Sequence, residues 1–439
     1  MATTYLSHTM STPTARTKST ISAWVKKTSE GANSTIFGGG DAATDCAFLN
    51  FNASDKLFLQ SATSDSADWG ITTDAVFRDP SAWYHVVAKI DTTQSTSTDR
   101  VKIYVNGNLQ TVTGSYPSQN YDMQWSRDGE VQLVGKYPST GIYFNGSMAH
   151  VHFTDGYAYD ASTFGETDST TGIWVSKTNP SVTYGTNGFF LKFENSGAMG
   201  TDSSGQSNTF SVSGTLTQNV DTPTNNFATL NPLDKGSDVN TTINGNTSAT
   251  WNGVNGHTIR STLAVSSGKY YWELNNANNL TVGIVSTEEP IIPTSGNLFP
   301  GGSGFGASSY SYKLSDGNKG NNNTFSSYGS AITTSDILGC ALDLDNGKIF
   351  WSKNGVWQDS GDPANGTNPA FTSISSDKTW SPAYGYVGSG ANTLNVNYGS
   401  GYFGTTAVSS AGSNASGIGI FEYDVPAGYT ALSTKGLDT

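Results

Sequence analysis

The chain has 439 residues, which is enough for two or three domains that each bury a core of their own. Its net charge of −13 repels phosphate backbones and anionic lipid surfaces, so we expect no nucleic-acid partner and no binding to anionic membranes. The composition has 50 glycines and only 13% charged residues, which argues against a helical enzyme and favours many short strands joined by tight turns.

The N-terminal segment and the apolar stretches bear on where the protein is made. Residues 1–20 are polar and have no apolar central run, so we expect no signal peptide and synthesis in a cytoplasm. No apolar stretch reaches the roughly 20 residues needed to cross a bilayer, so we expect no membrane insertion. Cys46 and Cys340 lie in separate apolar, strand-like contexts, which predicts two buried thiols rather than a disulfide.

The first part of the chain alternates apolar and polar residues with the period of two that strands require. The predicted strands cover residues 19–27, 45–51, 57–60, 82–91, 101–112, 131–134 and 148–153. The stretch 101–112 is a hairpin centred on Asn106-Gly107, a pair that tolerates the positive φ angles of tight hairpin turns. In this order ISAWVK, WYHVVA, KIYVNG and MAHVHF resemble the laminin-G or concanavalin-A-like jelly roll, over roughly residues 15–165.

The second part of the chain has further predicted strands at 268–275, 280–286 and 393–399. Its most informative stretch is 338–358, LGCALDLDNGKIFWSKNGVWQ, which reads as three strands joined by tight turns at 345–347 and 354–355. This run resembles the hallmark of SPRY domains, which are β-sandwich binding modules.

These patterns and resemblances predict an all-β protein: a laminin-G/concanavalin-A-like jelly roll followed by a SPRY-like β-sandwich. Pro223 and Pro232 restrict the backbone between the two and suggest a linker there. The expected organisation is a jelly roll with a C-terminal extension over 1–218, a linker over 219–236, a SPRY-like sandwich over 237–402 and a C-terminal tail over 403–439.

Four further segments resemble stretches found in structural proteins of tailed phages, often tail fibres. They are FGETDSTTGIWV at 164–175 and the stretches 184–210, 221–234 and 421–437. The resemblance implies a virion protein that is not an enzyme and that contacts a host-surface glycan or protein. It also implies other virion proteins as partners and a homo-oligomer, with a trimer as the usual state of phage fibres, so that weak sugar contacts gain avidity.

Two alternatives to a receptor-binding fibre stay open. A capsid or tail decoration protein would attach to virions without binding cells. A polysaccharide depolymerase would need two carboxylates about 5 Å apart. Asp343 and Asp345 lie close in sequence, but we interpret them as turn formers because they belong to the tight turn of the SPRY-like run.

The segment SQNYDMQWSRDGE at 118–130 is the predicted ligand surface. It brings Tyr121, Trp125, Arg127 and Asp128 together near loops. Exposed aromatic rings bind sugars by stacking on their C–H faces, while polar side chains hold the hydroxyl groups. Ordinary packing, or contact with a neighbouring virion protein, is the alternative. We assign other tryptophans to the core because they fall in predicted strands, namely Trp24, Trp83 and Trp351.

No metal or organic cofactor is required by these patterns, and calcium is the one ion that we consider further. Asp202, Ser204 and Asn208 in GTDSSGQSN offer oxygen ligands on a loop, as calcium prefers. An Asx-type turn explains the same residues without an ion, and we favour it. His150 and His152 have a spacing used in metal sites, but strand alternation explains them as outward residues, with Ala149, Val151 and Phe153 facing inward.

Overall fold

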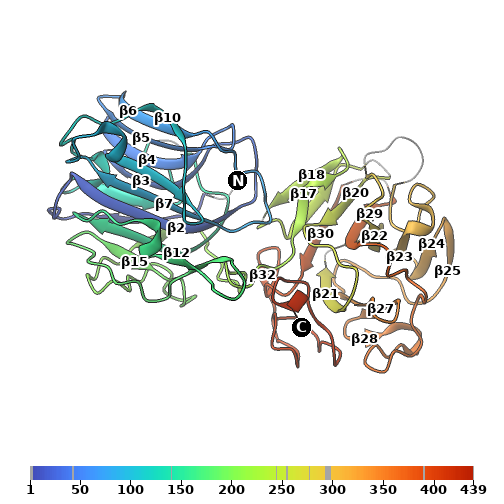
Figure 1. Cartoon of the computed structure of the whole chain (residues 1–439). Helices are drawn as coiled ribbons and strands as arrows, with labels where there is room; N and C mark the ends of the chain where they lie inside the picture. The colour runs from blue at the N-terminus through green and yellow to red at the C-terminus, as the bar shows by residue number, and fades with distance from the viewer. Residues whose placement is uncertain are drawn as a thin grey trace. The chain divides into compact units, whose positions relative to one another are not determined.

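The computed structural model describes residues 3–41, 44–139, 141–243, 245–253, 256–275, 277–291, 298–388 and 391–438. Within these ranges the chain is all β, with only short 3₁₀ turns and no α-helix. It divides into two compact units, Met1–Gln218 and Asn219–Thr439 (Figure 1). The all-β prediction is confirmed.

The first unit is a sandwich of two antiparallel sheets. The eight-stranded sheet has the order β10 (Val112–Ser115), β6 (Ser66–Thr73), β5 (Leu57–Thr63), β4 (Cys46–Phe51), β3 (Ser34–Gly40), β11 (Val131–Val134), β1 (Tyr5–Thr9) and β16 (Ser211–Ser213). The six-stranded sheet has the order β15 (Phe189–Leu191), β12 (Gly146–Asp155), β2 (Lys18–Lys27), β7 (Tyr84–Asp91), β8 (Val101–Val105) and β9 (Asn108–Leu109). A separate hairpin pairs β13 (Gly165–Thr167) with β14 (Trp174–Ser176), and the 3₁₀ turns are η1 (Ser97–Asp99), η2 (Gln124–Ser126) and η3 (Ala161–Thr163).

The core of the first unit lies between these two sheets. Alternate residues of each strand point inward, as Ile21, Ala23 and Val25 of β2 do, and all three are fully buried. They pack against Leu49 of β4 and Leu59 of β5 in the facing sheet. The period of two in the sequence therefore reflects the apolar face that each strand turns toward this core.

The second unit is also a two-sheet sandwich. One sheet has the order β17 (Leu230–Lys235), β20 (Thr258–Ser261), β29 (Trp380–Tyr386), β22 (Leu280–Ser286), β23 (Ser309–Lys313), β24 (Asn318–Asn321) and β25 (Thr324–Ser327). The other has the order β18 (Val239–Ile243), β19 (Ser248–Trp251), β30 (Asn392–Asn397), β21 (Lys269–Asn275), β26 (Leu338–Asp343), β27 (Lys348–Lys353) and β28 (Val356–Trp357), and β33 (Thr430–Ala431) pairs with β21 in parallel. The remaining elements are the hairpin of β31 (Tyr402–Phe403) with β32 (Thr406–Ala407) and the turns η4 (Gly306–Ser308), η5 (Gln358–Ser360) and η6 (Gly436–Asp438).

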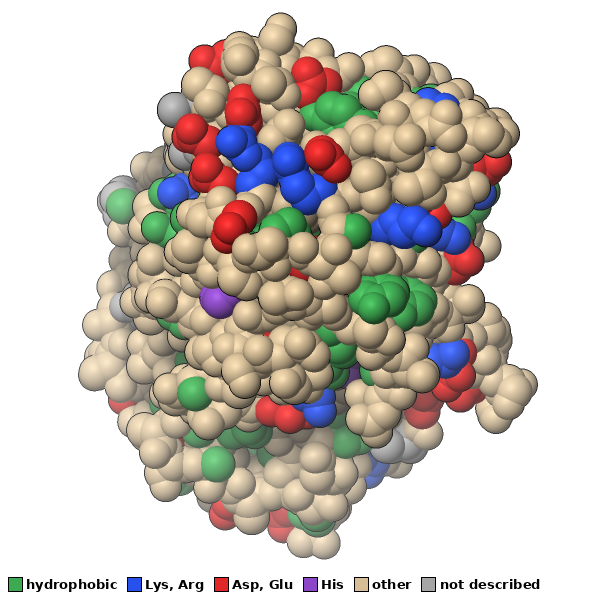
Figure 2. Space-filling model, turned by 90° about the vertical axis from the view of Figure 1, so that its left-hand side faces the viewer, with side chains coloured by type: hydrophobic (Ala, Val, Ile, Leu, Met, Phe, Trp, Pro, Cys, Tyr) green, Lys and Arg blue, Asp and Glu red, His purple; other side chains and the backbone are tan. Residues whose placement is uncertain are grey.

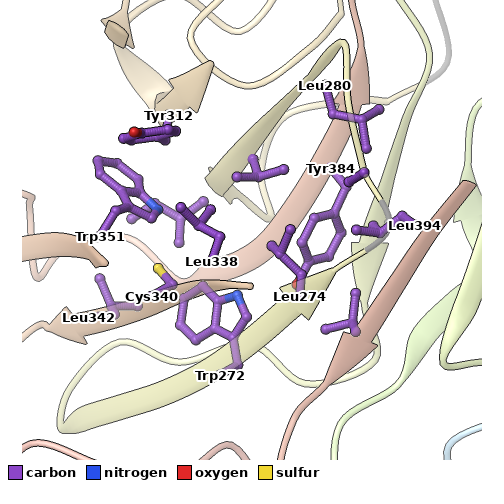
Figure 3. Packing of buried hydrophobic residues seen from close by; sticks show 14 of the residues in the cluster. Trp272, Leu274, Leu280, Tyr312, Leu338, Cys340, Leu342, Trp351, Tyr384 and Leu394 are labelled. Carbon is purple, nitrogen blue, oxygen red and sulfur yellow. The ribbon is translucent and has the colours of Figure 1, made fainter. Parts of the chain in front are cut away.

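The SPRY-like run forms the three strands expected of it, β26, β27 and β28. Cys340 pairs with Trp351, and the turn to β28 has Asn354 at φ 49° and Gly355 at φ 78°, as the Asn-Gly pair predicts. Figure 3 shows Trp351, Cys340 and Trp272 pointing into the core of this unit. Cys46 and Cys340 are both free and buried, as predicted.

Residues 219–236 do not form a free linker. They supply β17, and Leu230 is fully buried in the core of the second unit. Pro232 is compatible with this strand because β17 lies at the edge of its sheet, where a missing N–H costs little. The C-terminal tail lies beside this segment, with the Ala228 N–H donating to the Leu432 carbonyl at 2.9 Å.

The outward face of the six-stranded sheet is covered by residues 164–184, which we call the first cover. Trp174 Nε1 donates to His85 Nδ1 at 2.9 Å, and His85 also bonds Ser22 Oγ at 2.8 Å. The Trp174 ring lies so close to Gly107 that an added Cβ there would meet it at 2.6 Å. Glycine at the Asn106-Gly107 turn therefore serves both the hairpin and the cover.

The two histidines of β12 differ from the expected alternation. A β-bulge between Ala149 and His152 shifts the register, and His150 lies there with φ 48°. Ala149 pairs with Trp24 and so shares its outward face, whereas Val151 and Phe153 point inward as expected. His152 points outward but is only 1% exposed, because Tyr184 of the first cover bonds its Nδ1 at 2.9 Å.

Residues 418–432, which we call the second cover, lie over the outward face of the sheet that contains β21, β26 and β27 in the second unit. Phe421, Val425 and Tyr429 are buried there against Tyr271 of β21 and Phe350 of β27. Glu273 of β21 is fully buried beneath them and accepts the N–H groups of Glu422 and Tyr423 at 2.8 and 2.9 Å. The tail is thus part of the folded unit.

Candidate functional site

The predicted ligand segment lies where several connections of the first unit meet, and Tyr121 is its best-placed ring. The Tyr121 hydroxyl donates to Asp68 Oδ2 at 2.5 Å and bonds Ser61 Oγ at 3.0 Å. Asp68, which is exposed on β6, also accepts the Thr63 hydroxyl at 2.7 Å. Burial and the Asp68 carboxylate both raise the pKa of Tyr121, so this hydroxyl keeps its proton and acts as a donor.

The neighbouring charges of the segment are also held by other loops. Arg127 Nη1 pairs with Asp45 Oδ2 at 2.5 Å, and the Ser64 N–H donates to Asp45 Oδ1 at 2.9 Å. The Ser64 N–H first, and then Arg127, lower the pKa of Asp45 against the opposing effect of desolvation. Asp128 is exposed and accepts the Thr12 hydroxyl at 3.0 Å.

Trp125 does not belong to this surface, so its expected role as an exposed ring is wrong. It is 0% exposed in η2, and its Nε1 donates to Ser19 Oγ at 3.3 Å. The backbone of Gly39 in β3 allows this close approach, because a Cβ there would lie 3.0 Å from Trp125 Cβ. The indole therefore fills the core beside Phe37, with ring centroids 5.6 Å apart.

Other tryptophans that fall near predicted loops are buried as well. Trp69 and Trp380 are each 1% exposed, whereas Trp357 is half-buried. The three tryptophans assigned to the core are buried as expected, namely Trp24, Trp83 and Trp351. Sequence reasoning missed Asp68 as the partner of Tyr121 and Asp45 as the partner of Arg127, because no spacing in the sequence links these positions.

We define the loop-end site as Asp45, Asp68, Tyr121, Arg127 and Asp128. It has one half-buried aromatic ring, carboxylates that accept hydrogen bonds, and one guanidinium group. In the face drawn in Figure 2, acidic and basic side chains lie among uncharged atoms, and the hydrophobic patches are small and separate. Such a surface offers polar contacts and ring stacking rather than a large apolar interface.

The Asp202 turn has the geometry of the Asx alternative. Asp202 Oδ1 accepts the N–H groups of Phe190 and Ser204, and Oδ2 accepts Ser204 Oγ and the Asn208 N–H, at 2.8 to 2.9 Å. Both carboxylate oxygens are therefore occupied by donors from the chain. Calcium at Asp202, Ser204 and Asn208 would have to displace these donors, and it stays a prediction.

The acidic pair at the SPRY-like turn has structural contacts. Asp343 is 1% exposed, accepts Asn346 Nδ2 at 2.9 Å and pairs with Lys269 at 3.2 Å. Asp345 accepts the Gly268 N–H at 2.7 Å. These contacts agree with their interpretation as turn formers. Across the described ranges, no group of three or more His, Cys, Asp or Glu side chains is arranged to hold a metal ion.

No helix among the described residues is long and apolar enough to span a bilayer.

Comparisons with known proteins identify both folds. Residues 1–162 match the family model described as the concanavalin A-like lectin/glucanases superfamily, and residues 269–400 match the SPRY domain model. A curated relative, the ATP-dependent RNA helicase DDX1 of Xenopus laevis, is 37% identical over 101 residues, which are 23% of this chain and 12% of the helicase. The chain thus spans about an eighth of that relative's length.

Solved structures similar to this chain include two SPRY-type domains and a toxin. The SPRY domain of human HERC1 is 16% identical over 38% of this chain and 96% of that chain, with a TM-score of 0.30. The TRIM65 PSpry domain is 14% identical over 39% of this chain and 88% of that chain, with a TM-score of 0.29. Stonustoxin is 16% identical over 39% of this chain and 27% of that chain, with a TM-score of 0.31. On the two family matches, this protein contains a concanavalin-A-like domain followed by a SPRY domain.

Proposed function

We propose that this protein is a structural component of a tailed-phage virion that binds a host-surface glycan through the loop-end site of its first unit. The support for the virion assignment is the resemblance of 164–175, 184–210, 221–234 and 421–437 to segments of phage structural proteins. The support for binding is the pair of folds, because both families include modules that bind ligands. We also propose that the protein is not an enzyme and that its partners are other virion proteins and the host glycan.

The observation that carries the glycan proposal is the arrangement around Tyr121. Its ring is half-buried and fixed by Asp68 and Ser61, so it loses little conformational freedom when a ligand binds. A sugar ring can stack its C–H face on such a ring. The carboxylates of Asp45, Asp68 and Asp128 can accept hydrogen bonds from its hydroxyl groups.

Such a site binds one sugar weakly, and repetition on an oligomer would supply avidity. We propose a homo-oligomer for this reason, with a trimer as the form expected of a fibre.

The experiment measures binding of the fluorescently labelled full chain to a panel of bacterial strains with different surface polysaccharides. We expect saturable binding to particular strains that the purified polysaccharide of the same strain abolishes. Tyr121→Ala should weaken this binding by about tenfold or more, the equivalent of about 1.4 kcal/mol. Tyr157→Ala is the matched control, because Tyr157 is an exposed tyrosine of the same unit, at 37%, outside the loop-end site.

Three outcomes would overturn the proposal in different ways. No binding to any strain, together with firm attachment to virions, would favour a decoration protein. Equal effects of Tyr121→Ala and Tyr157→Ala would place the binding site elsewhere. Release of reducing ends from the polysaccharide would identify a depolymerase.

A further inference from the structure

Lys27 and Asp55 form a buried ion pair that joins the two sheets of the first unit. Lys27 Nζ lies 2.5 Å from Asp55 Oδ1, and the side chains are only 1% and 4% exposed. Lys27 ends β2 of the six-stranded sheet, whereas Asp55 lies in the turn between β4 and β5 of the eight-stranded sheet. By contrast, the Lys18–Asp91 pair of the same unit has a lysine side chain that is 40% exposed.

The surroundings of this pair are aromatic and largely free of water. Lys27 Nζ lies 5.0 Å from the centre of the Phe51 ring and donates to the Phe77 carbonyl at 3.2 Å. Phe51 and Phe77 are 0% and 8% exposed, with their rings 6.2 Å apart. Charges in such surroundings lose much of their hydration, so the two groups are held against each other rather than separated by solvent.

A third ionisable group, Glu30, interacts electrostatically with both members of the pair. Glu30 follows Lys27 closely in sequence, and its Oε1 atom is buried with no hydrogen-bond partner. Burial raises the pKa of Glu30, and the Asp55 charge adds to this while Lys27 opposes it. A buried polar atom without a partner needs an explanation, and a carboxyl with a raised pKa is suited to carrying protons.

Two donors polarise the Asp55 carboxylate. The Gly31 N–H donates to Oδ1 at 3.0 Å, and Arg78 Nε donates to Oδ2 at 3.3 Å. Burial raises the pKa of Asp55, but the bonds from Lys27 and Gly31 outweigh burial and hold it below its ordinary value. The resting state is therefore an ion pair, and donors are already in place to stabilise negative charge on the oxygens if a nucleophile adds to Cγ.

We propose that Lys27 and Asp55 condense into an intramolecular amide, with Glu30 as the proton carrier. The ammonium first gives a proton to the Asp55 carboxylate, which leaves a neutral amine and a carboxylic acid. The Nζ lone pair then attacks Cγ and forms the C–N bond. The Glu30 carboxylate takes a proton from this nitrogen and passes it to the departing hydroxyl, the Cγ–O bond breaks, and one water leaves. Glu30 returns to its starting state, and nothing is oxidised or reduced.

The product fits the contacts already present. The amide N–H keeps the Phe77 carbonyl as its acceptor, and the amide oxygen keeps the Gly31 N–H as its donor. The oxygen that leaves is on the side of Arg78, whose side chain is 63% exposed, so the water has a route to solvent. Two buried charges are replaced by one neutral, bonded group. The resulting cross-link would hold the two sheets together in a protein whose two cysteines are both free.

The test is the intact mass of the full chain, purified folded and measured after denaturation. We expect a mass lower than that of the sequence by one water molecule, and a proteolytic peptide in which the Lys27 and Asp55 segments are joined. Lys27→Arg and Asp55→Ala should restore the full mass. Glu30→Gln should also restore it, although it keeps both reacting residues. Lys18→Arg is the matched control. It changes a lysine of the partly exposed Lys18–Asp91 pair and leaves Lys27 and Asp55 intact, so the loss of water should remain.

Separate Lys27 and Asp55 peptides in the wild-type protein would overturn the proposal. A lower mass alone does not support it, since an aspartate that cyclises elsewhere in the chain also loses one water. Should Lys27→Arg or Asp55→Ala fail to fold, the wild-type peptide map and Glu30→Gln still decide. If the Lys27 and Asp55 peptides are still joined in Glu30→Gln, the cross-link forms without Glu30 and its proposed role is wrong.

Discussion

In both units one sheet has an outward face that a later part of the chain covers, but the group buried beneath each cover differs. In the first unit that group is His85, which bonds Trp174 of the first cover. In the second unit it is Glu273, which holds two backbone N–H groups of the second cover. His85 is a base and Glu273 is an acid, so their contributions to the stability of the two covers change with pH in opposite directions.

The first cover needs an uncharged histidine. An indole N–H can only donate, so His85 Nδ1 must be an unprotonated acceptor. Burial lowers the pKa of His85 to about 3, with a smaller contribution from His150. The unfolded chain therefore binds this proton more readily, and the contribution of His85 to stability is complete above pH 6.5 and is lost as the pH falls from there toward 3.

The second cover favours a protonated glutamate. Burial raises the pKa of Glu273 to about 7, against the lowering effect of the N–H groups of Glu422 and Tyr423 and the Tyr271 hydroxyl. The folded state then binds the proton more readily than the unfolded chain. The contribution to stability is complete below pH 4.5 and is lost as the pH rises through 7.

The two covers also limit where a ligand can bind. Both outward faces are occupied by the chain's own side chains, with His152 and Tyr271 each 1% exposed. A partner would have to displace a cover to reach either face. The loops at the end of the first unit need no such displacement, which is why we place the proposed glycan site there.

The largest expected effect is the loss of a ring from either cover. Phe164→Ala in the first cover and Phe421→Ala in the second should each lower the free energy of unfolding by about 3–5 kcal/mol, because these side chains are 2% and 1% exposed. Denaturant titration of the full chain measures this. Ile173→Ala and Val356→Ala, at exposed positions of 61% and 69%, are the controls and should change it by less than about 0.5 kcal/mol. Losses below about 1 kcal/mol in the ring variants would mean that the covers are not part of the folded units.

The next effect is the pH dependence that Glu273 gives to the second unit. Between pH 4.5 and pH 8, Glu273 should lower the wild-type free energy of unfolding by about 3 kcal/mol as it ionises. Glu273→Gln removes this titration, so the difference between the two proteins should change by that amount across the range. Denaturant titrations at several pH values measure it, with Glu288→Gln, whose side chain is 63% exposed, as the control. If the difference in free energy of unfolding between wild type and Glu273→Gln stays constant with pH, the pKa of Glu273 is not raised in the folded protein.

The smallest effect concerns the bond between Trp174 and His85. Trp174→Phe removes the only donor atom of the indole and should cost about 1–2 kcal/mol at pH 7, since a buried acceptor is left without its partner. Wild-type stability should also fall as the pH drops below 6.5, the reverse of the trend that Glu273 produces. Thermal unfolding of both proteins at pH 7 and pH 5 measures this. An unchanged midpoint for Trp174→Phe at pH 7 would count against the bond.

Much of the fold could be predicted because strands with one apolar face toward the core leave a period of two in the sequence. Residues 101–112 and 338–358 also contain Asn-Gly or Asn-Gly-like turns, which fix where the chain reverses. The covers could not be predicted in this way. Their strands, such as β14 and β33, are short, and Trp174 rests on a polar face made by His85 and Ser22, for which no hydrophobic period exists.

The candidate site was predictable only in part. Tyr121, Arg127 and Asp128 are not fully buried, and each bonds a side chain from another segment, but Trp125 turns inward, because a 3₁₀ turn has no alternation to reveal its buried side. The bulge at His150 similarly shifts the faces of β12 without a signal in the sequence. Asp45, Asp68 and the Lys27–Asp55 pair depend on contacts between strands that are distant in the chain.

Amide hydrogen exchange of the full chain, alone and with the surface polysaccharide of a strain that it binds, would show whether both covers stay closed while the loop-end site binds. We expect slow exchange at Glu422 and Tyr423 and across β14 without any ligand, and new protection confined to 118–128 and the neighbouring loops when the polysaccharide is added. Fast exchange in both covers, with polysaccharide protection appearing on β7 or β21 instead, would show that the covers yield to ligands and that the binding surface is a sheet face.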